Sequence, residues 1–415
     1  MNISVILPFL ILTLGAFLLI KLRFFFILHP INTIRCAFGK GSRREGAITL
    51  ALSLAGTLGV GNIVGVASAI AIGGAGSVLW LMLSALFSSA IKYSEISLSI
   101  KSGGEGIMGV LRAEFGHGGR LLSVLYASLC LTLSLSMGCI LQAGAIRGAA
   151  EAVSSNGMPY ILCAAFFLAA SVCAFGKSGI RRAVALTVPF AAATYTGICL
   201  CVISANFRDI PYVIRDILAS AFTPTGAAGG IFGILTSRAV SEGFAAGLLS
   251  NEAGAGTSSL AHSGVGNTDA ARAGSLGIIE VIVDTVVICP LTAFAILLGD
   301  IDAGGGVLAL GELFAKHIPF GAEALLLSVL AFALSTVICW YYYGSVCREY
   351  LFGRRGGIVY FIVFIICLAV GLFTRSGYAV RITNFILLGL TVMTALAIKK
   401  GADEIKAPSA RYSDD

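Results

Sequence analysis

Charge is scarce in this sequence. Of its 415 residues only 12% are Asp, Glu, Lys or Arg, whereas 57% are hydrophobic. A soluble domain carries about 25% charged residues, so too little polar surface is present here to cover a water-soluble globule. This scarcity excludes an ordinary soluble domain, and the surplus apolar side chains are expected to face lipid.

The sequence also lacks the short motifs of several enzyme and metal-protein classes. It contains no Walker A, HExxH or G-x-S-x-G pattern, and no CxxC or Cys/His spacing that indicates zinc. Its 11 cysteines lie mostly in apolar runs, where they behave as small apolar residues. No basic domain with interleaved aromatic residues is present. We therefore predict no enzyme, no nucleic-acid partner and no obligate protein partner.

What the sequence has instead is long apolar runs. Each is near or above the ~20 residues that a helix needs to cross a bilayer. Only helices and closed barrels satisfy the backbone in lipid, and these runs lack the alternation of barrel strands. They predict an all-α integral membrane protein with about 11 transmembrane helices. The runs are Ile3–Ile20, Ala47–Ile72, Val78–Ile100, Leu121–Ile146, Tyr160–Phe175, Ala183–Ser204, Ile231–Leu260, Ser275–Leu298, Ala322–Tyr343, Gly357–Phe373 and Ile382–Ile398.

The first run is interpreted as a retained anchor helix over residues 1–27 rather than a signal peptide. No side-chain charge precedes it, and basic residues such as Lys21 and Arg23 follow it. If the loop after this anchor is cytoplasmic, about 20 Lys and Arg fall in inside loops and 6 in outside loops. This asymmetry predicts a plasma or inner membrane protein with its N-terminus outside and its C-terminus cytoplasmic.

Two of the runs contain interruptions that a membrane helix tolerates poorly. Gly56–Asn62 reads GTLGVGN and Ser250–Gly256 reads SNEAGAG. A glycine costs about 1 kcal/mol inside a helix, and Asn or Glu at membrane depth costs more. Both segments are therefore predicted to be unwound.

The positions of the two interruptions suggest their purpose. If the anchor is left out of the count, the two interruptions fall in the first and the sixth of ten spans. Each interruption therefore lies at the start of one half of five helices. Because five is odd, the two halves lie in opposite orientation across the membrane. We assign residues 47–206 to a first repeat, 230–400 to a second repeat and 401–415 to a disordered cytoplasmic tail. Paired interruptions in inverted halves are typical of a secondary-transporter binding site. The alternative is close helix packing through small residues such as Gly61 and Gly65.

An unwound helix offers free N–H groups to an anion and free carbonyls to a cation. Segments Gly59–Asn62 and Ser250–Gly254 could therefore hold a zwitterion that travels with a small cation. Ser335 and Thr336 could complete a cation site of oxygen atoms, or could bond carbonyls of their own helix. Gln142 could bind substrate or tie two helices together.

Each of the other polar residues in the runs has two possible interpretations. Trp340 shares a helix face with Thr336, so it could wall the pocket, or it could anchor the helix at the interface. Glu242, Glu280 and Asp284 are candidates for function because they lie in apolar spans. Pairing of these carboxylates with Arg147 or Arg238 is the structural alternative.

Three further residues are predicted to be structural. Lys92 and Glu95 are spaced i,i+3 and are expected to pair with each other on one helix near the cytoplasmic face. His262 is expected to be structural rather than a proton relay.

Several stretches resemble the sodium:alanine/glycine symporters, in family order from the anchor to about Gly353. The resemblance implies a LeuT-like fold of five plus five inverted helices with one extra N-terminal helix, and sodium-driven uptake of alanine, glycine or a similar amino acid. The matching stretches are Gly56–Ala67 (GTLGVGNIVGVA) with Gly73–Gly76, Ser250–Gly256 with Ala261–His262 and Asp284–Thr285, Ala331–Thr336 (AFALST) with Trp340–Gly344 (WYYYG), and Phe222–Thr225 (FTPT).

The resemblance also assigns residues to the site, to which we add the backbone of the two interruptions. A co-transported sodium ion would be held by carbonyls near Gly59 with Asn62, Ser335 and Thr336. The substrate would be contacted by Gly59, Gly61, Asn62, Gln142, Asn251, Gly254, Thr336 and Trp340.

The chain departs from the family pattern in several places, as a divergent member does. Val60 replaces a usual Thr, Ala143–Ala145 replaces Ala-Asn-Ser, and Gly103–Met108 replaces Gly-Gly-Pro-Met-Tyr-Tyr. The alternatives left open are proton coupling through Glu242, Glu280 or Asp284, a different small amino acid or amine, and a sensor that binds an amino acid without moving it.

Overall fold

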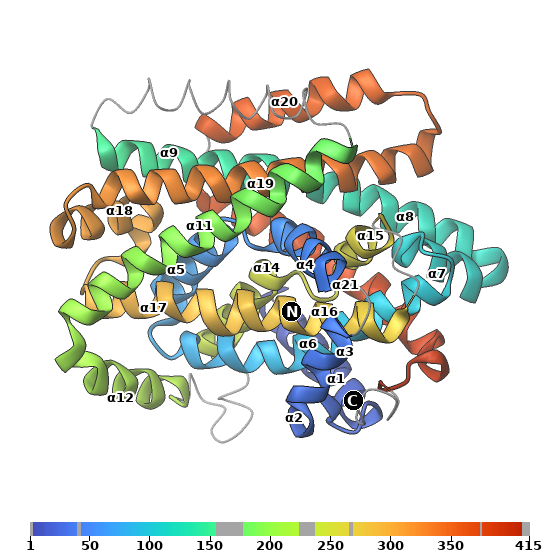
Figure 1. Ribbon diagram of the computed structural model, residues 1–415, viewed down its shortest axis with the longest axis horizontal. Helices are drawn as coiled ribbons and strands as arrows, with labels where there is room; N and C mark the ends of the chain where they lie inside the picture. Colours follow the sequence, from blue (N-terminus) through green and yellow to red (C-terminus); the bar gives the residue numbers. More distant parts are fainter. Residues whose placement is uncertain are drawn as a thin grey trace.

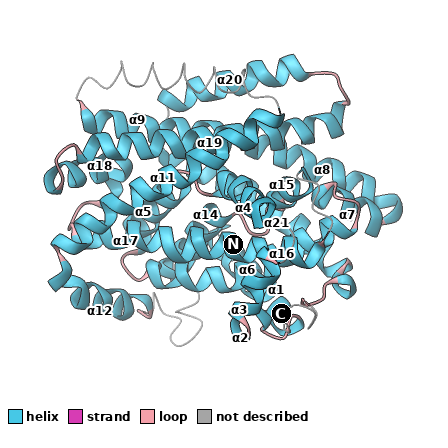
Figure 2. Cartoon of the chain, in the orientation of Figure 1, coloured by secondary structure: helices cyan, strands magenta, loops and turns pink. Residues whose placement is uncertain are grey.

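Helices make up all of the regular structure in the computed structural model, which describes residues 3–39, 43–154, 177–223, 237–264, 269–373 and 376–408 (Figure 1). Coloured by secondary structure, these ranges contain only helices and loops (Figure 2). The prediction of an all-helical protein is therefore confirmed for the described residues.

Six helical stretches are long and apolar enough to cross a membrane, and the bent pair 46–57 and 61–73 adds a seventh if it counts as one span. The multi-pass architecture is confirmed. The total of eleven stays a prediction, and the run Tyr160–Phe175 lies outside the described residues. The six stretches belong to α6 (Ser77–Lys101), α8–η1–α9 (Gly116–Leu135, Ser136–Leu141, Gln142–Val153), α11 (Lys177–Ala205), α16–η3–α17 (Ala270–Val281, Ile282–Ile288, Cys289–Leu298), α19 (Gly321–Phe352) and α21 (Ser376–Lys400).

Burial separates the central helices from the peripheral ones. In its most apolar stretch α19 is 78% buried inside the protein, against 33% for α11. α11 exposes Leu186, Phe190 and Leu200, as expected of a helix that faces lipid. The central helices pack around two interrupted helices, because α6 contacts α14 and α19 contacts α4 (Figure 1).

Both predicted interruptions are present. Between the helices of the second break, Glu252, Gly254 and Gly256 have positive φ angles of 56°, 87° and 76°. Glycine adopts this region without strain, whereas a left-handed Glu252 costs about 1–3 kcal/mol, so surrounding contacts must hold it there. The first break separates α4 (Arg43–Thr57) from α5 (Gly61–Gly73) with a bend of 43°, and the second separates α14 (Arg238–Asn251) from α15 (Thr257–Gly264).

Two π-helical segments were not predicted. η1 lies between α8 and α9 and ends immediately before Gln142, whereas η3 contains Asp284 and Thr285. A π-helical turn accommodates one extra residue in a helix and often accompanies a functional site. Each segment therefore changes the direction in which the polar side chains at or after it point.

The first and the last described segments of the chain pack against the bundle. α1 (Ile3–Lys21) contacts α6, α14 and α21. The tail was predicted to be disordered, and for residues 401–408 this is wrong: Ile405 is buried, and the Tyr93 hydroxyl donates to the Lys406 carbonyl at 2.7 Å. The remaining elements are α2 (Phe25–Leu28), α3 (Pro30–Phe38), α7 (Gly106–Glu114), η2 (Phe207–Asp209), α12 (Ile210–Ala221), η4 (Ala303–Gly305), α18 (Gly306–His317), α20 (Gly357–Phe373) and η5 (Ala402–Glu404).

Candidate substrate and cation site

The first break is enclosed by α9 and α19. The Val60 backbone N–H donates to Oε1 of Gln142 at 3.4 Å, and the Thr336 hydroxyl donates to the Leu58 carbonyl at 3.5 Å. All of these groups are buried. The break therefore exposes its backbone to a neutral amide on one side and a hydroxyl on the other.

Trp340 also lies against the first break. Its side chain is 0% exposed, and its Nε1–H donates to the Gly56 carbonyl at 3.3 Å. The interfacial-anchor alternative is therefore wrong, because the indole lies inside the protein against the first break. Ser335, in contrast, donates to the Phe332 carbonyl of its own helix at 2.9 Å, which leaves its oxygen lone pairs available to a cation.

Gly59 lies close to both Thr336 and Gln142. A Cβ atom built on it would be 2.8 Å from Oγ1 of Thr336 and 3.2 Å from Nε2 of Gln142. No side chain fits at this position without displacing one of the two. Glycine is thus required by close approach and not by its backbone angles.

We expect Gly59→Ala to lower the initial rate of transport several-fold, because overpacking a well-packed site costs about 1–3 kcal/mol. The matched control is Gly197→Ala on α11, where a new Cβ meets no atom within 4 Å. The measurement is uptake per folded protein in proteoliposomes. Equal rates for both variants would show that the contact of Gly59 with Thr336 is unimportant.

A second polar cluster joins the two interrupted helices through η3. Nδ2 of Asn62, on α5, donates to Oδ1 of Asp284 at 2.6 Å. The hydroxyls of Ser250, on α14, and Thr285 both donate to Oδ2 of the same carboxylate. Asn251 then donates through Nδ2 to Thr285 at 3.0 Å. Asn62 and Asn251, predicted separately, are therefore linked through Asp284 and Thr285.

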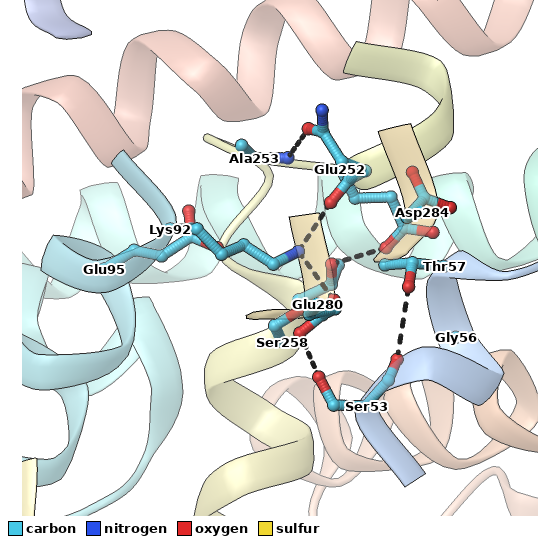
Figure 3. Close-up of polar contacts among 12 residues, drawn as sticks. Ser53, Gly56, Thr57, Lys92, Glu95, Glu252, Ala253, Ser258, Glu280 and Asp284 are labelled. Atoms are coloured by element: carbon cyan, nitrogen blue, oxygen red, sulfur yellow. Dashed lines mark hydrogen bonds and ion pairs between the residues drawn. The ribbon is translucent and has the colours of Figure 1, made fainter. Parts of the chain in front are cut away.

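A third polar cluster surrounds Glu280, toward which the side chains of Lys92, Ser53 and Ser258 point (Figure 3). Nζ of Lys92 lies 3.0 Å from Oε1 of Glu280, and both side chains are 0% exposed. The hydroxyl of Ser258, on α15, donates to Oε1 at 2.9 Å, and that of Ser53, on α4, donates to Oε2. Glu280 therefore connects α4, α6 and α15.

This cluster corrects two expectations. Lys92 pairs with Glu280 and not with its helix neighbour Glu95, because α6 is buried at this depth and the ammonium finds a carboxylate on another helix. Glu280 likewise pairs with a lysine and not with an arginine, and Arg147 bonds Glu151 on its own helix at 2.7 Å. The signal that could have revealed this is charge at membrane depth, which requires a partner.

The other predicted residues are placed as follows. Gly61 begins α5 against α14, because a Cβ on it would be 3.1 Å from the Leu249 carbonyl oxygen. The Gly254 N–H donates to a carboxylate oxygen of Glu95 at 2.9 Å. His262 is buried, and neither ring nitrogen has a partner within the described ranges. Glu242 is half-buried and lies outside the three clusters.

The oxygen atoms at the first break suit an alkali cation. Carbonyls of an unwound helix and hydroxyls of a neighbouring helix are the donors that sodium takes in such folds. In the part of the chain that the structure describes, no three His, Cys, Asp or Glu side chains converge to hold a metal ion. The oxygen donors near Gly59 include the Leu58 carbonyl and the Thr336 hydroxyl.

Two interrupted helices at the centre of an all-helical membrane bundle, each bordered by buried polar side chains, define a secondary transporter. More particularly, the chain belongs to the sodium:alanine symporter family, whose model matches residues 1–413. It is thus a symporter and not an enzyme.

Two relatives illustrate the similarity. The sodium/alanine symporter AgcS of Methanococcus maripaludis is 32% identical over 382 residues, which cover 86% of this chain and 82% of the relative. The uncharacterized transporter YflA of Bacillus subtilis is 30% identical over 414 residues, which cover 95% of this chain and 87% of the relative. The similarity thus spans most of the chain.

A solved structure shares the fold. A Na+-coupled sialic acid symporter in a substrate-bound outward-open state matches with a TM-score of 0.60, 14% sequence identity, and coverage of 99% of this chain and 89% of that one. At this identity the likeness concerns the fold alone. The helix arrangement is thus similar to that of this symporter.

Proposed function

We propose that this protein couples inward sodium flow to uptake of a small neutral amino acid, alanine or glycine, by alternating access. The observation that carries the proposal is the first break, where the backbone around Gly59 lies between Gln142 and Thr336. Its N–H groups at the start of α5 suit a carboxylate, and its carbonyls suit a cation. The name of AgcS supports alanine as substrate.

The proposed site has two parts. The sodium ion would be held near the first break by the Gly59 backbone, Asn62, Ser335 and Thr336. The substrate would contact Gly59, Gly61, Asn62, Gln142, Asn251, Gly254, Thr336 and Trp340.

The proposed architecture is the LeuT-like arrangement of two inverted repeats, 47–206 and 230–400, after the anchor helix. The N-terminus would lie outside and the C-terminus in the cytoplasm. The breaks between α4 and α5 and between α14 and α15 lie near the start of each repeat, which supports this arrangement. One bundle would rock against the other around a site near the midplane.

The energetics are sufficient for accumulation. One positive charge that moves through ~100 mV releases about 2.3 kcal/mol, and a roughly tenfold sodium gradient adds about 1.4 kcal/mol. Since each tenfold of substrate gradient costs about 1.4 kcal/mol, one sodium ion could sustain an accumulation of about a few hundred-fold.

The test is uptake of labelled alanine and glycine into proteoliposomes, with an inward sodium gradient or with potassium in its place. We expect saturable accumulation with sodium only. Accumulation that persists without sodium and collapses with a protonophore would instead favour proton coupling. Specific binding without accumulation would favour a sensor.

A further inference from the structure

The second break has two ends of opposite polarity. The last carbonyls of α14 form a partially negative end, and the first N–H groups of α15 form a partially positive one. In a transporter these are the groups that could bind a co-transported cation and an anionic substrate group. What occupies them therefore decides whether this break takes part in transport.

Both ends are already occupied by side chains of α6. Nζ of Lys92 donates to the Asn251 carbonyl, at the end of α14, at 2.6 Å. Oε2 of Glu95 accepts the N–H groups of Gly254 and Gly256, ahead of α15, at 2.9 and 3.3 Å. The two side chains are three residues apart, so they lie on one face of α6. One helix turn thus supplies a cation to one end and an anion to the other.

The first break is contacted by side chains of a different kind. Its contacts with Gln142, Thr336 and Trp340 are all with neutral side chains. In these contacts its backbone groups meet neutral hydrogen-bonding groups and no full charge. Both breaks interrupt their helices in the same way, but they differ in the charge of the side chains that contact them.

The oxygens around the Lys92 ammonium are those that a sodium ion would use. They are the Asn251 carbonyl oxygen and Oε1 of Glu280, at 2.6 and 3.0 Å. A further buried carboxylate lies one residue beyond Asn251: Oε2 of Glu252 accepts from Thr257 at 2.7 Å, and its Oε1 has no partner among the described residues. Without Lys92 the Glu280 carboxylate would lose its ion-pair partner.

We propose that Lys92 is a resident cation, which permanently takes the place of a second co-transported ion at the α14–α15 break. Resting on the proposed function, this assigns ion and carboxylate exchange to the first break alone. Glu95 correspondingly occupies the N–H groups of Gly254 and Gly256, so the substrate contact proposed at Gly254 would not involve the substrate carboxylate. Lys92 and Glu95 are positioning residues, because they act by holding the second break.

The experiment measures how many sodium ions the purified protein binds, with ²²Na+ and a scintillation-proximity assay. We expect Lys92→Gln to bind about one sodium ion more per chain than the wild type. Its melting temperature should rise more steeply with NaCl than that of the wild type, relative to N-methylglucamine chloride. Lys92→Gln/Glu280→Gln should return to the wild-type number, because the carboxylate that would hold the new ion is gone.

Two controls accompany these variants. Lys92→Arg keeps the positive charge and should bind the wild-type number of ions. Lys101→Gln removes an exposed lysine from the end of the same helix and should also leave the number unchanged. An extra ion in either control would contradict the role of the Lys92 charge.

The proposal is overturned if folded Lys92→Gln binds the wild-type number of sodium ions. It is also overturned if that variant fails to fold in both salts while the double variant folds, since then no ion can replace the ammonium. A wild type that binds no sodium would contradict the proposed function. The comparison of single and double variants would still decide the role of Lys92.

Discussion

Replacing Glu280 with leucine is expected to lower the free energy of unfolding by about 3–5 kcal/mol. The carboxylate lies 3.0 Å from Nζ of Lys92 in a fully buried pair and also accepts hydroxyls of Ser53 and Ser258. Leucine is similar in volume but leaves an ammonium buried without its counter-charge. The melting temperature of the purified protein in detergent should fall by many degrees.

The control is Glu151→Leu, which breaks the ion pair of Glu151 with Arg147. Those side chains are 36% and 38% exposed, and such a pair on one helix contributes about 0.3–0.5 kcal/mol. The double variant Lys92→Met/Glu280→Leu should recover most of the loss, because apolar residues often replace a buried pair without cost. If Glu280→Leu melts like Glu151→Leu, the ion pair does not hold the three helices together.

Thr336→Ala is expected to raise the sodium concentration for half-maximal uptake by about 10- to 100-fold, or to abolish uptake. The hydroxyl lies at the first break, 3.5 Å from the Leu58 carbonyl oxygen. A hydroxyl that binds a charged group contributes about 1.5–3 kcal/mol, which corresponds to this range. The measurement is the sodium dependence of alanine uptake at fixed membrane potential.

Two variants show whether this effect is specific. Thr336→Ser keeps the hydroxyl and should stay close to the wild type. Thr194→Ala removes a hydroxyl from α11 that, among the described residues, bonds the Phe190 carbonyl of its own helix at 2.9 Å, so sodium dependence should not change. Unchanged sodium dependence in Thr336→Ala would remove this residue from the site.

Much of the architecture could be predicted because the bilayer restricts it. Apolar runs of membrane-spanning length exclude a soluble fold, and lipid leaves helices as the regular structure that such runs can form. The two breaks were also predictable, since Gly56–Asn62 and Ser250–Gly256 are the places where an apolar helix is costliest. These are properties of single segments, and neighbouring segments do not alter them.

The contacts of the polar residues could not be predicted in the same way. Lys92 and Glu95 fit a pair on one helix, yet each bonds a group about 160 positions further along the chain. The π-helical segment η3, which contains Asp284, has no recognised sequence signal. The hydrogen bond from Tyr93, on α6, to the Lys406 carbonyl likewise joins segments far apart in the chain.

The sequence by itself thus determined a helical membrane protein of the sodium:alanine symporter family and the two places where its helices break. Only the tertiary structure decided that the two breaks differ, one bordered by the neutral groups of Gln142 and Thr336, the other closed by Lys92 and Glu95. The physical reason is that helix formation and insertion depend on local composition. The partner of a buried charge depends on which distant groups the packed helices bring within hydrogen-bonding distance.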